Sequence, residues 1–279
     1  MRSLLYVPGN AERMIEKARL SDADGVILDL EDAIAPAQKE AAREVVARIL
    51  READFGARQV FVRINGLATP YAVEDARAVA ATGGAGILIP KVESVDEIAT
   101  IAPILASGPS ESTQQRRLLC LIESPSGVLA CRELAAGSPF VTGVVFGSAD
   151  LALEIGCSLT AGEPELLYAR SHVLLAARAA GVAAYDSPHF LIADLEGLRR
   201  ACEATRHLGY DGKTVIHPSH IATVNEVFAP TEAEIAEAKR IVAAMNEAAA
   251  EGLGAITLDG RLVDQVHLAH AKKILSKVP

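Results

Sequence analysis

Residues 121–127 read Leu121-Ile122-Glu123-Ser124-Pro125-Ser126-Gly127, an apolar run that ends in a carboxylate and continues into small residues suited to a helix start. Residues 145–150 repeat this order as Val145-Phe146-Gly147-Ser148-Ala149-Asp150. An apolar run with an acid at its end and a helix behind it is typical of a buried parallel strand and its crossover helix. The two stretches therefore predict successive strands that deliver two carboxylates to the same edge of a sheet.

The order of short apolar strand, polar strand end and helix recurs along the chain. We predict strands at residues 3–7, 25–30, 60–64, 86–90, 118–122, 143–146, 182–185 and 213–216. Helices of about ten to eighteen residues separate them, as expected for a parallel sheet that is covered by helices. A polar, serine-rich segment at 107–117 interrupts the alternation and is predicted to be an exposed connection. Eight strand–helix units predict an α/β fold, a (β/α)8 TIM barrel.

Length and composition restrict the class of protein. A chain of 279 residues that is 50% apolar can bury one large core. We predict a barrel domain at residues 1–229 and a C-terminal helical extension at 230–279. The net charge of −9, without a basic cluster among aromatic residues, argues against a nucleic-acid partner. No export signal and no apolar stretch near the roughly 20 residues of a spanning helix is seen, so we expect a cytoplasmic protein with no membrane partner.

Polar residues collect where the predicted strands end. In a TIM barrel the active site lies at the C-terminal ends of the strands. The side chains expected on this rim are Asp29, Glu31, Asp32, Arg63, Asn65, Lys91, Glu93, Glu123, Asp150, Asp186 and His217. Strand ends also face solvent and helix caps, so each residue alone has an ordinary structural explanation. Their convergence on one rim favours a functional site.

Glu123 and Asp150 are the candidate metal ligands. Ser124 and Ser126 already supply helix caps after Glu123, which leaves its carboxylate available. Asp150 has a stronger structural alternative, since aspartate is itself a favoured cap. Two carboxylates together with water and a chelating substrate would complete the octahedral shell of Mg2+, an ion often held by one or two carboxylates. The sequence therefore predicts a magnesium site.

A cation and a small-residue turn on the same rim would suit an anionic substrate. Arg63 ends a buried strand, and its planar guanidinium can bind a carboxylate bidentately. An ion pair with Asp29, Glu31 or Asp32 is the structural alternative. Gly147, Ser148 and Ala149 form a turn whose backbone N–H groups would be free to bind a substrate carboxylate at a helix N-terminus.

These residues lie in motifs that resemble the citrate lyase β-subunit family, within the wider HpcH/HpaI aldolase group. The matching stretches run in order across nearly the whole chain: Arg2-Ser3-Leu4-Leu5-Tyr6-Val7-Pro8-Gly9, Asp29-Leu30-Glu31-Asp32-Ala33, Val62-Arg63-Ile64-Asn65, Pro90-Lys91-Val92-Glu93, Ile122-Glu123-Ser124, Phe146-Gly147-Ser148-Ala149-Asp150 and Gly212-Lys213-Thr214-Val215-Ile216-His217-Pro218. The resemblance implies that Glu123 and Asp150 bind Mg2+ and that Arg63 binds a 2-oxo acid.

The C-terminal tail resembles that of the same family. There, an aspartate that matches Asp264 reaches the active site of a neighbouring subunit and acts on the methyl group of the acyl-CoA. The resemblance thus implies a homo-oligomer, for example a trimer, whose extension packs on or completes a neighbouring site. The structural alternative is that Asp264 caps the last helix.

The function implied is a Mg2+-dependent carbon–carbon lyase that splits a citryl-CoA-like 3-hydroxy-3-carboxylate acyl thioester into acetyl-CoA and a 2-oxo acid such as oxaloacetate. Asp264 would act as acid or base, and Glu31 and Asp32 would orient Arg63 or metal-bound water. The thioester carrier would be CoA or an acyl carrier protein. The alternatives are a malyl-CoA or citramalyl-CoA lyase or synthase, a class II 2-oxo-acid aldolase, and a non-catalytic binding subunit of a lyase assembly.

Overall fold

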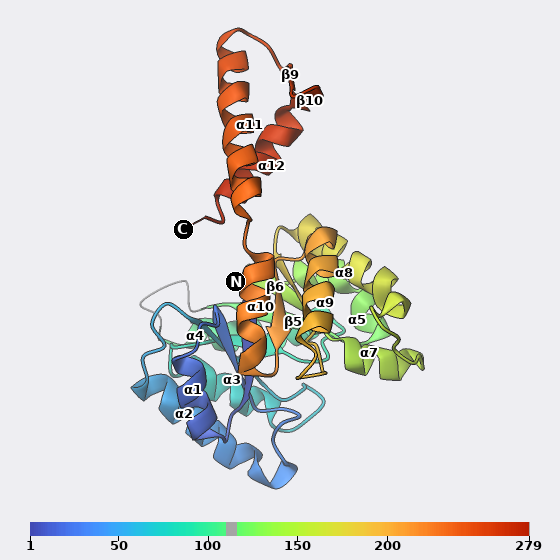
Figure 1. Cartoon of the computed structure of the whole chain (residues 1–279). Helices are drawn as coiled ribbons and strands as arrows, with labels where there is room; N and C mark the ends of the chain where they lie inside the picture. The colour runs from blue at the N-terminus through green and yellow to red at the C-terminus, as the bar shows by residue number, and fades with distance from the viewer. Residues whose placement is uncertain (110–115, 279) are drawn as a thin grey trace. The chain divides into compact units, whose positions relative to one another are not determined.

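The fold is a closed barrel of eight parallel strands surrounded by helices (Figure 1). The structure is a computed structural model that describes residues 1–109 and 116–278, so residues 110–115 of the expected connection lie outside it. Each strand pairs with the next in the chain, and β1 pairs with β8. The strands are β1 Ser3–Pro8, β2 Gly25–Asp29, β3 Gln59–Arg63, β4 Gly86–Ile89, β5 Leu118–Ile122, β6 Val141–Phe146, β7 Ala183–Asp186 and β8 Gly212–Val215. The predicted (β/α)8 barrel is confirmed.

Side chains from the strands fill the inside of the barrel. One core cluster contains Leu4, Ile27, Phe61, Leu88, Leu119, Leu121, Val145 and Tyr185. Because alternate residues of a strand point to the same face, the residue two positions later also faces inward, nearer the C-terminal end. Ile27 is followed in this way by Asp29, Phe61 by Arg63, and Leu121 by Glu123. The packing of the core therefore aims these charged groups at one opening.

The helices of the first part of the chain alternate with the strands as predicted. They are α1 Glu12–Arg19, α2 Lys39–Glu52, α3 Ala72–Ala80, α4 Val95–Ser107, α5 Pro125–Leu129, α6 Cys131–Ala135, α7 Ser148–Ile155, α8 Leu167–Ala180, α9 Leu195–Leu208 and α10 Ile221–Phe228, with short 3-10 turns at Pro36–Gln38, Pro164–Leu166 and Pro218–His220. The single helix expected after β5 is two short helices, α5 and α6, that join at Ala130.

The contacts divide the chain into two compact units, residues 1–225 and 226–279. The second unit contains α11 Glu232–Ala250, the antiparallel strands β9 Ala255–Leu258 and β10 Arg261–Asp264, and α12 Gln265–Leu275. Met245, Val263 and Leu268 form its small core. The β9–β10 hairpin was not predicted. In the described part of the chain, no helix is long and apolar enough to cross a bilayer.

Candidate active site

A cavity of about 570 Å3 opens at the C-terminal ends of the strands. Most of the predicted site residues line it: Asp32, Arg63, Glu123, Gly147, Ser148 and Asp150. Glu31 does not line the cavity but forms an ion pair with Arg63, which does. The barrel thus brings together in one pocket side chains that are up to 118 positions apart, from Asp32 to Asp150.

Glu123 is a buried carboxylate with an exposed fraction of 3%. Its Oε1 accepts a hydrogen bond of 2.9 Å from the backbone N–H of Lys91, and Lys91 adopts a left-handed conformation with φ +48° that is uncommon for a residue with a side chain. Burial, with the negative charges of Glu31 and Asp150, raises the pKa of Glu123 to about 8. An acid held in this way is stabilised either by a proton or by a bound cation.

Asp150 lies in the first turn of α7, at its third residue. The N-cap of this helix is Gly147, so the structural alternative, in which Asp150 caps the helix, is excluded. Its carboxylate is partly exposed and its Oδ1 lies 3.8 Å from Nζ of Lys91. Asp150 therefore presents its carboxylate to the pocket beside Glu123.

The turn before α7 leaves no space for a side chain at position 147. A β-carbon at Gly147 would lie 2.5 Å from Cβ of Glu123, which only glycine avoids. The N–H of Gly147 donates to the carbonyl of Ile122 at 2.9 Å, so this one of the expected free N–H groups is already used. Ser148 is 1% exposed, lines the pocket, and its Oγ has no hydrogen-bond partner among the described residues. An unpartnered buried hydroxyl beside a pocket suits a polar ligand.

Arg63 is held by a bidentate ion pair. Its Nε and Nη2 donate to the two carboxylate oxygens of Asp29 at 2.7 and 2.6 Å. Asp29 and Arg63 are direct partners in the β2–β3 register, which explains the contact. Although burial opposes it, hydrogen bonding to Asp29 raises the pKa of Arg63 well above its usual range. Arg63 therefore forms the ion pair that was the structural alternative in the sequence. Its remaining nitrogen, Nη1, faces Glu31 and Asp32.

Glu31 and Asp32 differ in their surroundings. Glu31 is 7% exposed, and its two oxygens lie 3.0 Å from Arg63 Nη1 and 3.2 Å from Lys91 Nζ. Burial raises its pKa. Asp32 is more exposed and lies 3.5 Å from Arg63 Nη1. Both contact Arg63, and the Lys91 ammonium also lies near Glu31, Asp32 and Asp150.

Asp264 belongs to the C-terminal unit and is the N-cap of α12. Its Oδ1 accepts from the backbone N–H of Val266 at 3.0 Å and lies 2.7 Å from Nδ1 of His267. The hydrogen bond from His267 lowers the pKa of Asp264. Asp264 therefore caps α12, which was the structural alternative. Its catalytic role stays a prediction.

Comparison with known proteins identifies the family. A model of the HpcH/HpaI aldolase/citrate lyase family matches residues 2–218. This chain belongs to that family. A second model, for a carbon–carbon bond lyase of the TIM-barrel fold, matches residues 168–278 of this HpcH/HpaI-family chain.

Relatives extend over almost the whole chain. A (3S)-malyl-CoA thioesterase of Cereibacter sphaeroides (strain ATCC 17025 / ATH 2.4.3) is 39% identical over 276 residues, which cover 99% of this chain and 94% of the relative. Citrate lyase subunit beta of Leuconostoc mesenteroides subsp. cremoris is 35% identical, covering 98% and 92%. The protein CitE of Mycobacterium tuberculosis, solved with magnesium, acetoacetate and coenzyme A, is 32% identical with a TM-score of 0.83, covering 99% and 97%.

Two further structures from Mycobacterium tuberculosis hold different oxo acids. One contains magnesium and pyruvate, with 29% identity, a TM-score of 0.75 and coverage of 98% and 97%. The other contains oxaloacetate and magnesium, with 33% identity, a TM-score of 0.69 and coverage of 82% and 96%. Magnesium is common to these structures.

A buried ion network, which sequence reasoning missed, supports one side of the HpcH/HpaI-family pocket. Asp186 at the end of β7 is fully buried and is paired with both Lys213 and Arg170. The Arg170 guanidinium lies 5.0 Å from the ring centroid of Phe146, which lines the pocket. Asp186 was expected on the open rim, but its charge is enclosed. The only available signal was the presence of opposite charges on distant segments, Arg170 and Asp186.

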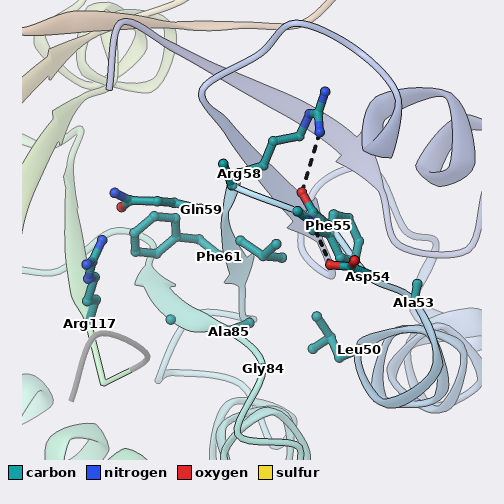
Figure 2. Close-up of a pocket in the computed structure, with 14 residues that line it drawn as sticks. Leu50, Ala53, Asp54, Phe55, Arg58, Gln59, Phe61, Gly84, Ala85 and Arg117 are labelled. Carbon is teal, nitrogen blue, oxygen red and sulfur yellow. Dashed lines mark hydrogen bonds between the residues drawn. The ribbon is translucent and has the colours of Figure 1, made fainter. Parts of the chain in front are cut away.

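A second cavity of about 500 Å3 lies at the opposite end of the barrel, near the starts of β3 and β4 (Figure 2). Phe61, Leu50 and Arg117 are among its walls. Arg58 is turned away from Phe61 and donates to the backbone carbonyls of Ser21 and Phe55. The acids and Ser148 that line the first pocket do not line this second one, so we assign the candidate active site to the C-terminal end of the barrel.

Proposed function

We propose that this chain is a Mg2+-dependent lyase that cleaves a 3-hydroxy-3-carboxylate acyl-CoA into acetyl-CoA and a 2-oxo acid. The observation that carries the proposal is the pairing of Glu123 and Asp150 in a pocket that also contains Arg63 and the unpartnered hydroxyl of Ser148. The relatives support the same class, since they include citrate lyase β subunits and a protein solved with magnesium and coenzyme A.

The residues present fit Mg2+. Glu123 is a buried acid whose pKa of about 8 reflects burial and two acidic neighbours, and a divalent cation would relieve that repulsion. Among the described residues, no group of three or more His, Cys, Asp or Glu side chains is arranged to hold a metal. Two carboxylates suit Mg2+, which usually keeps water or substrate oxygens at its other positions.

The remaining pocket groups suit the oxo-acid half of the substrate. Arg63 lines the pocket and would place positive charge beside the oxygen that becomes the carbonyl. Ser148 opens α7, and its hydroxyl and N–H would bind the substrate carboxylate at the helix N-terminus. Asp29 would keep the Arg63 guanidinium in one orientation throughout.

In the cleavage, the bond between C2 and C3 of the acyl group breaks. The 3-hydroxyl gives its proton to solvent and becomes the carbonyl of the 2-oxo acid, while the electron pair of the broken bond passes to C2 as the thioester enolate, which then takes up one proton. When bound, Mg2+ supplies Lewis-acid stabilisation of the oxygen at C3. Asp264 would protonate C2 to give acetyl-CoA, or remove a methyl proton in the reverse direction. The hydrogen bond from His267 lowers the pKa of Asp264, so its carboxylate is ionised, as removal of a proton requires.

The proposal includes a homo-oligomer, because we expect Asp264 to act at the pocket of a neighbouring subunit. The carrier of the acyl group would be CoA or an acyl carrier protein, and the M. tuberculosis protein with coenzyme A favours CoA. A cytoplasmic location would be consistent with substrates of this class.

A second candidate function is thioester hydrolysis. The (3S)-malyl-CoA thioesterase is 39% identical to this chain over nearly its full length. Hydrolysis would break the carbon–sulfur bond, release free CoA and leave the carbon skeleton of the acid intact. The lyase and the thioesterase therefore differ in both products.

Product analysis tests the proposal. Purified protein with Mg2+ is incubated with citryl-CoA, malyl-CoA and citramalyl-CoA, and acetyl-CoA, free CoA, 2-oxo acid and hydroxy acid are quantified by chromatography. We expect equal amounts of acetyl-CoA and a 2-oxo acid from at least one substrate. Free CoA with an intact hydroxy acid would favour the thioesterase, and no turnover in protein that binds Mg2+ would favour a binding subunit or an aldolase.

A pair of variants tests Asp264. Asp264→Asn and Asp264→Ser both keep a residue that can cap α12, so both should fold with an unchanged melting temperature. We expect both to lose thioester turnover while they still bind the oxo acid with Mg2+. Retained turnover in the two variants would leave Asp264 as a helix cap only.

A further inference from the structure

Two polar side chains lie at the N-terminal ends of the barrel strands, at the opposite end from the candidate active site. Gln59 precedes the core residue Phe61 by two positions, and Arg117 precedes the core residue Leu119 by two. Because alternate residues of a strand point to the same face, Gln59 and Arg117 lie below inward-facing core side chains. Both line the second cavity of about 500 Å3, and Figure 2 shows them beside the Phe61 ring.

A glycine in the strand between them brings this wall of the cavity together. Gly86 begins β4, which lies between β3 and β5 in the barrel. A β-carbon at Gly86 would lie 2.8 Å from Cδ1 of Phe61 and 2.7 Å from the carbonyl oxygen of Arg117. The absence of a side chain therefore allows the Phe61 ring and the Arg117 backbone to approach each other across β4.

The guanidinium of Arg117 and the side-chain amide of Gln59 are available to a ligand. Within residues 1–109 and 116–278, neither group forms a hydrogen bond or an ion pair. Both side chains are half-buried. A charged group that is partly removed from water and has no partner is unfavourable, so an anion bound to Arg117 would be stabilising.

The neighbouring charges are already engaged. Asp24 and Asp211, before β2 and β8, each form an ion pair of 2.8 Å with an arginine other than Arg117. Asp54 lines the cavity, but its Oδ1 accepts a backbone N–H at 2.7 Å, and Figure 2 shows it across the cavity from Arg117. Arg58, the second arginine of the lining, donates to backbone carbonyls. Arg117 is therefore the cation of this cavity that can pair with a ligand.

We propose that this cavity binds a small organic acid that carries one carboxylate and a short apolar or aromatic body. The Arg117 guanidinium would bind the carboxylate through two parallel N–H···O bonds, and the Gln59 amide would donate to one of its oxygens. The body of the acid would pack against Phe61 and Leu50, which also line the cavity. One available cation opposite the acid Asp54 suits a monoanion better than phosphate, which carries more charge.

The proposed site is separate from the candidate active site. No described residue lines both cavities, which lie at opposite ends of the barrel. The inference therefore does not depend on the proposed lyase function, and either one can fail while the other holds.

A binding titration with benzoate tests the site. Benzoate has one carboxylate and a flat apolar ring, and saturation-transfer NMR measures its binding to the full chain in buffer with a chelator, so that no Mg2+ is present. We expect saturable binding with a dissociation constant of about 1 mM, as for a small ligand with one charge-assisted contact. Inorganic phosphate at the same concentration should not displace benzoate.

Three variants locate the bound benzoate. Arg117→Gln removes the cation and should weaken binding by about tenfold or more, while Gln59→Leu removes one donor and should weaken it roughly threefold. Arg132→Gln is the matched control, because Arg132 is exposed, lines neither cavity and undergoes the same change in charge. Melting temperatures check that each variant is folded, and Gln59→Leu carries the test if Arg117→Gln does not fold.

The outcomes decide for or against the site. Binding that is weakened by Arg117→Gln and Gln59→Leu but not by Arg132→Gln would establish it. Absence of saturable binding, or binding that folded Arg117→Gln and Gln59→Leu leave unchanged, would overturn it. Displacement of benzoate by phosphate would overturn the assignment to a monocarboxylate.

Discussion

Gly147 and Glu123 are in direct backbone-to-side-chain contact, and a β-carbon at position 147 would lie 2.5 Å from Cβ and 2.8 Å from Oε2 of Glu123. The absence of a side chain at Gly147 therefore leaves room for the Glu123 side chain. Gly147→Ala should displace the Glu123 carboxylate and weaken Mg2+ binding by roughly 10- to 100-fold, the range for lost orientation of a metal ligand. Calorimetric titration with Mg2+ measures the change.

Gly66→Ala is the control for this substitution. Gly66 also follows a barrel strand, but a β-carbon there would have no atom within 4 Å. Its Mg2+ affinity should equal that of the wild-type protein. Equal affinities in all three proteins would show that Glu123 is not a ligand or that its position does not matter.

Mg2+ binding should release a proton. With a pKa of about 8, the Glu123 carboxyl is mostly protonated at pH 7 in the metal-free protein. Because this pKa lies above the ordinary 4.5, stability without Mg2+ should fall as the pH rises from about 4.5 to 8. Mg2+ would replace the proton, so its apparent affinity should increase up to about tenfold per pH unit below 8.

Calorimetry in buffers of different ionisation enthalpy counts the released protons. We expect close to one near pH 7 and close to zero above pH 9. Glu123→Gln should show no release at either pH. Release that is unchanged between pH 7 and pH 9 would contradict the assignment of the proton to Glu123.

The Asp29–Arg63 pair should support both stability and substrate binding. Asp29→Ala leaves the buried Arg63 without its bidentate partner and removes the acceptor for the N–H of Glu31. We expect a loss of about 3 kcal/mol in the free energy of unfolding, typical of a broken buried pair. Urea denaturation measures this loss, and pyruvate affinity should fall in the folded variant. A stability within error of the wild type would mean that Glu31 and Asp32 suffice to hold Arg63.

The buried network around Asp186 should be purely structural. Asp186→Ala leaves two buried cations, Arg170 and Lys213, without their shared partner, so the free energy of unfolding should fall by about 3–5 kcal/mol. Glu196→Ala removes the exposed ion pair with Arg200 and should have little effect. Similar denaturation midpoints for the two variants would contradict the importance of the network.

Much of the fold was predictable because barrel strands carry a simple signal. Each strand is a short apolar run with a polar end, and a (β/α)8 barrel follows once eight such runs are counted. The same logic placed Arg63, Glu123 and Asp150 at one rim, because the C-terminal ends of the barrel strands meet there. The pocket they share follows from closure of the barrel.

The ion-pair partners of Arg63 and Asp186 could not be predicted, because they depend on which distant segments the fold brings together. Arg63 had three acids to choose from, and only the strand register makes Asp29 its partner. Asp186 had the same strand-end position as Glu123, yet Arg170 from a helix encloses its charge. The β9–β10 hairpin consists of four-residue strands around Asp259 and Gly260, which are too short to give a clear alternation.

The central claim is that Glu123 and Asp150 hold the Mg2+ that drives carbon–carbon cleavage. The most direct measurement is the rate of acetyl-CoA and 2-oxo acid formation from citramalyl-CoA or malyl-CoA as Mg2+ is titrated, in the wild-type protein and in Asp150→Asn. Glu154→Gln, an exposed acid on the same helix α7, is the control. We predict activity that disappears without Mg2+, survives in Glu154→Gln and is lost or requires far more Mg2+ in Asp150→Asn. Cleavage that proceeds equally in the presence of a chelator, or equally in Asp150→Asn, would contradict the account.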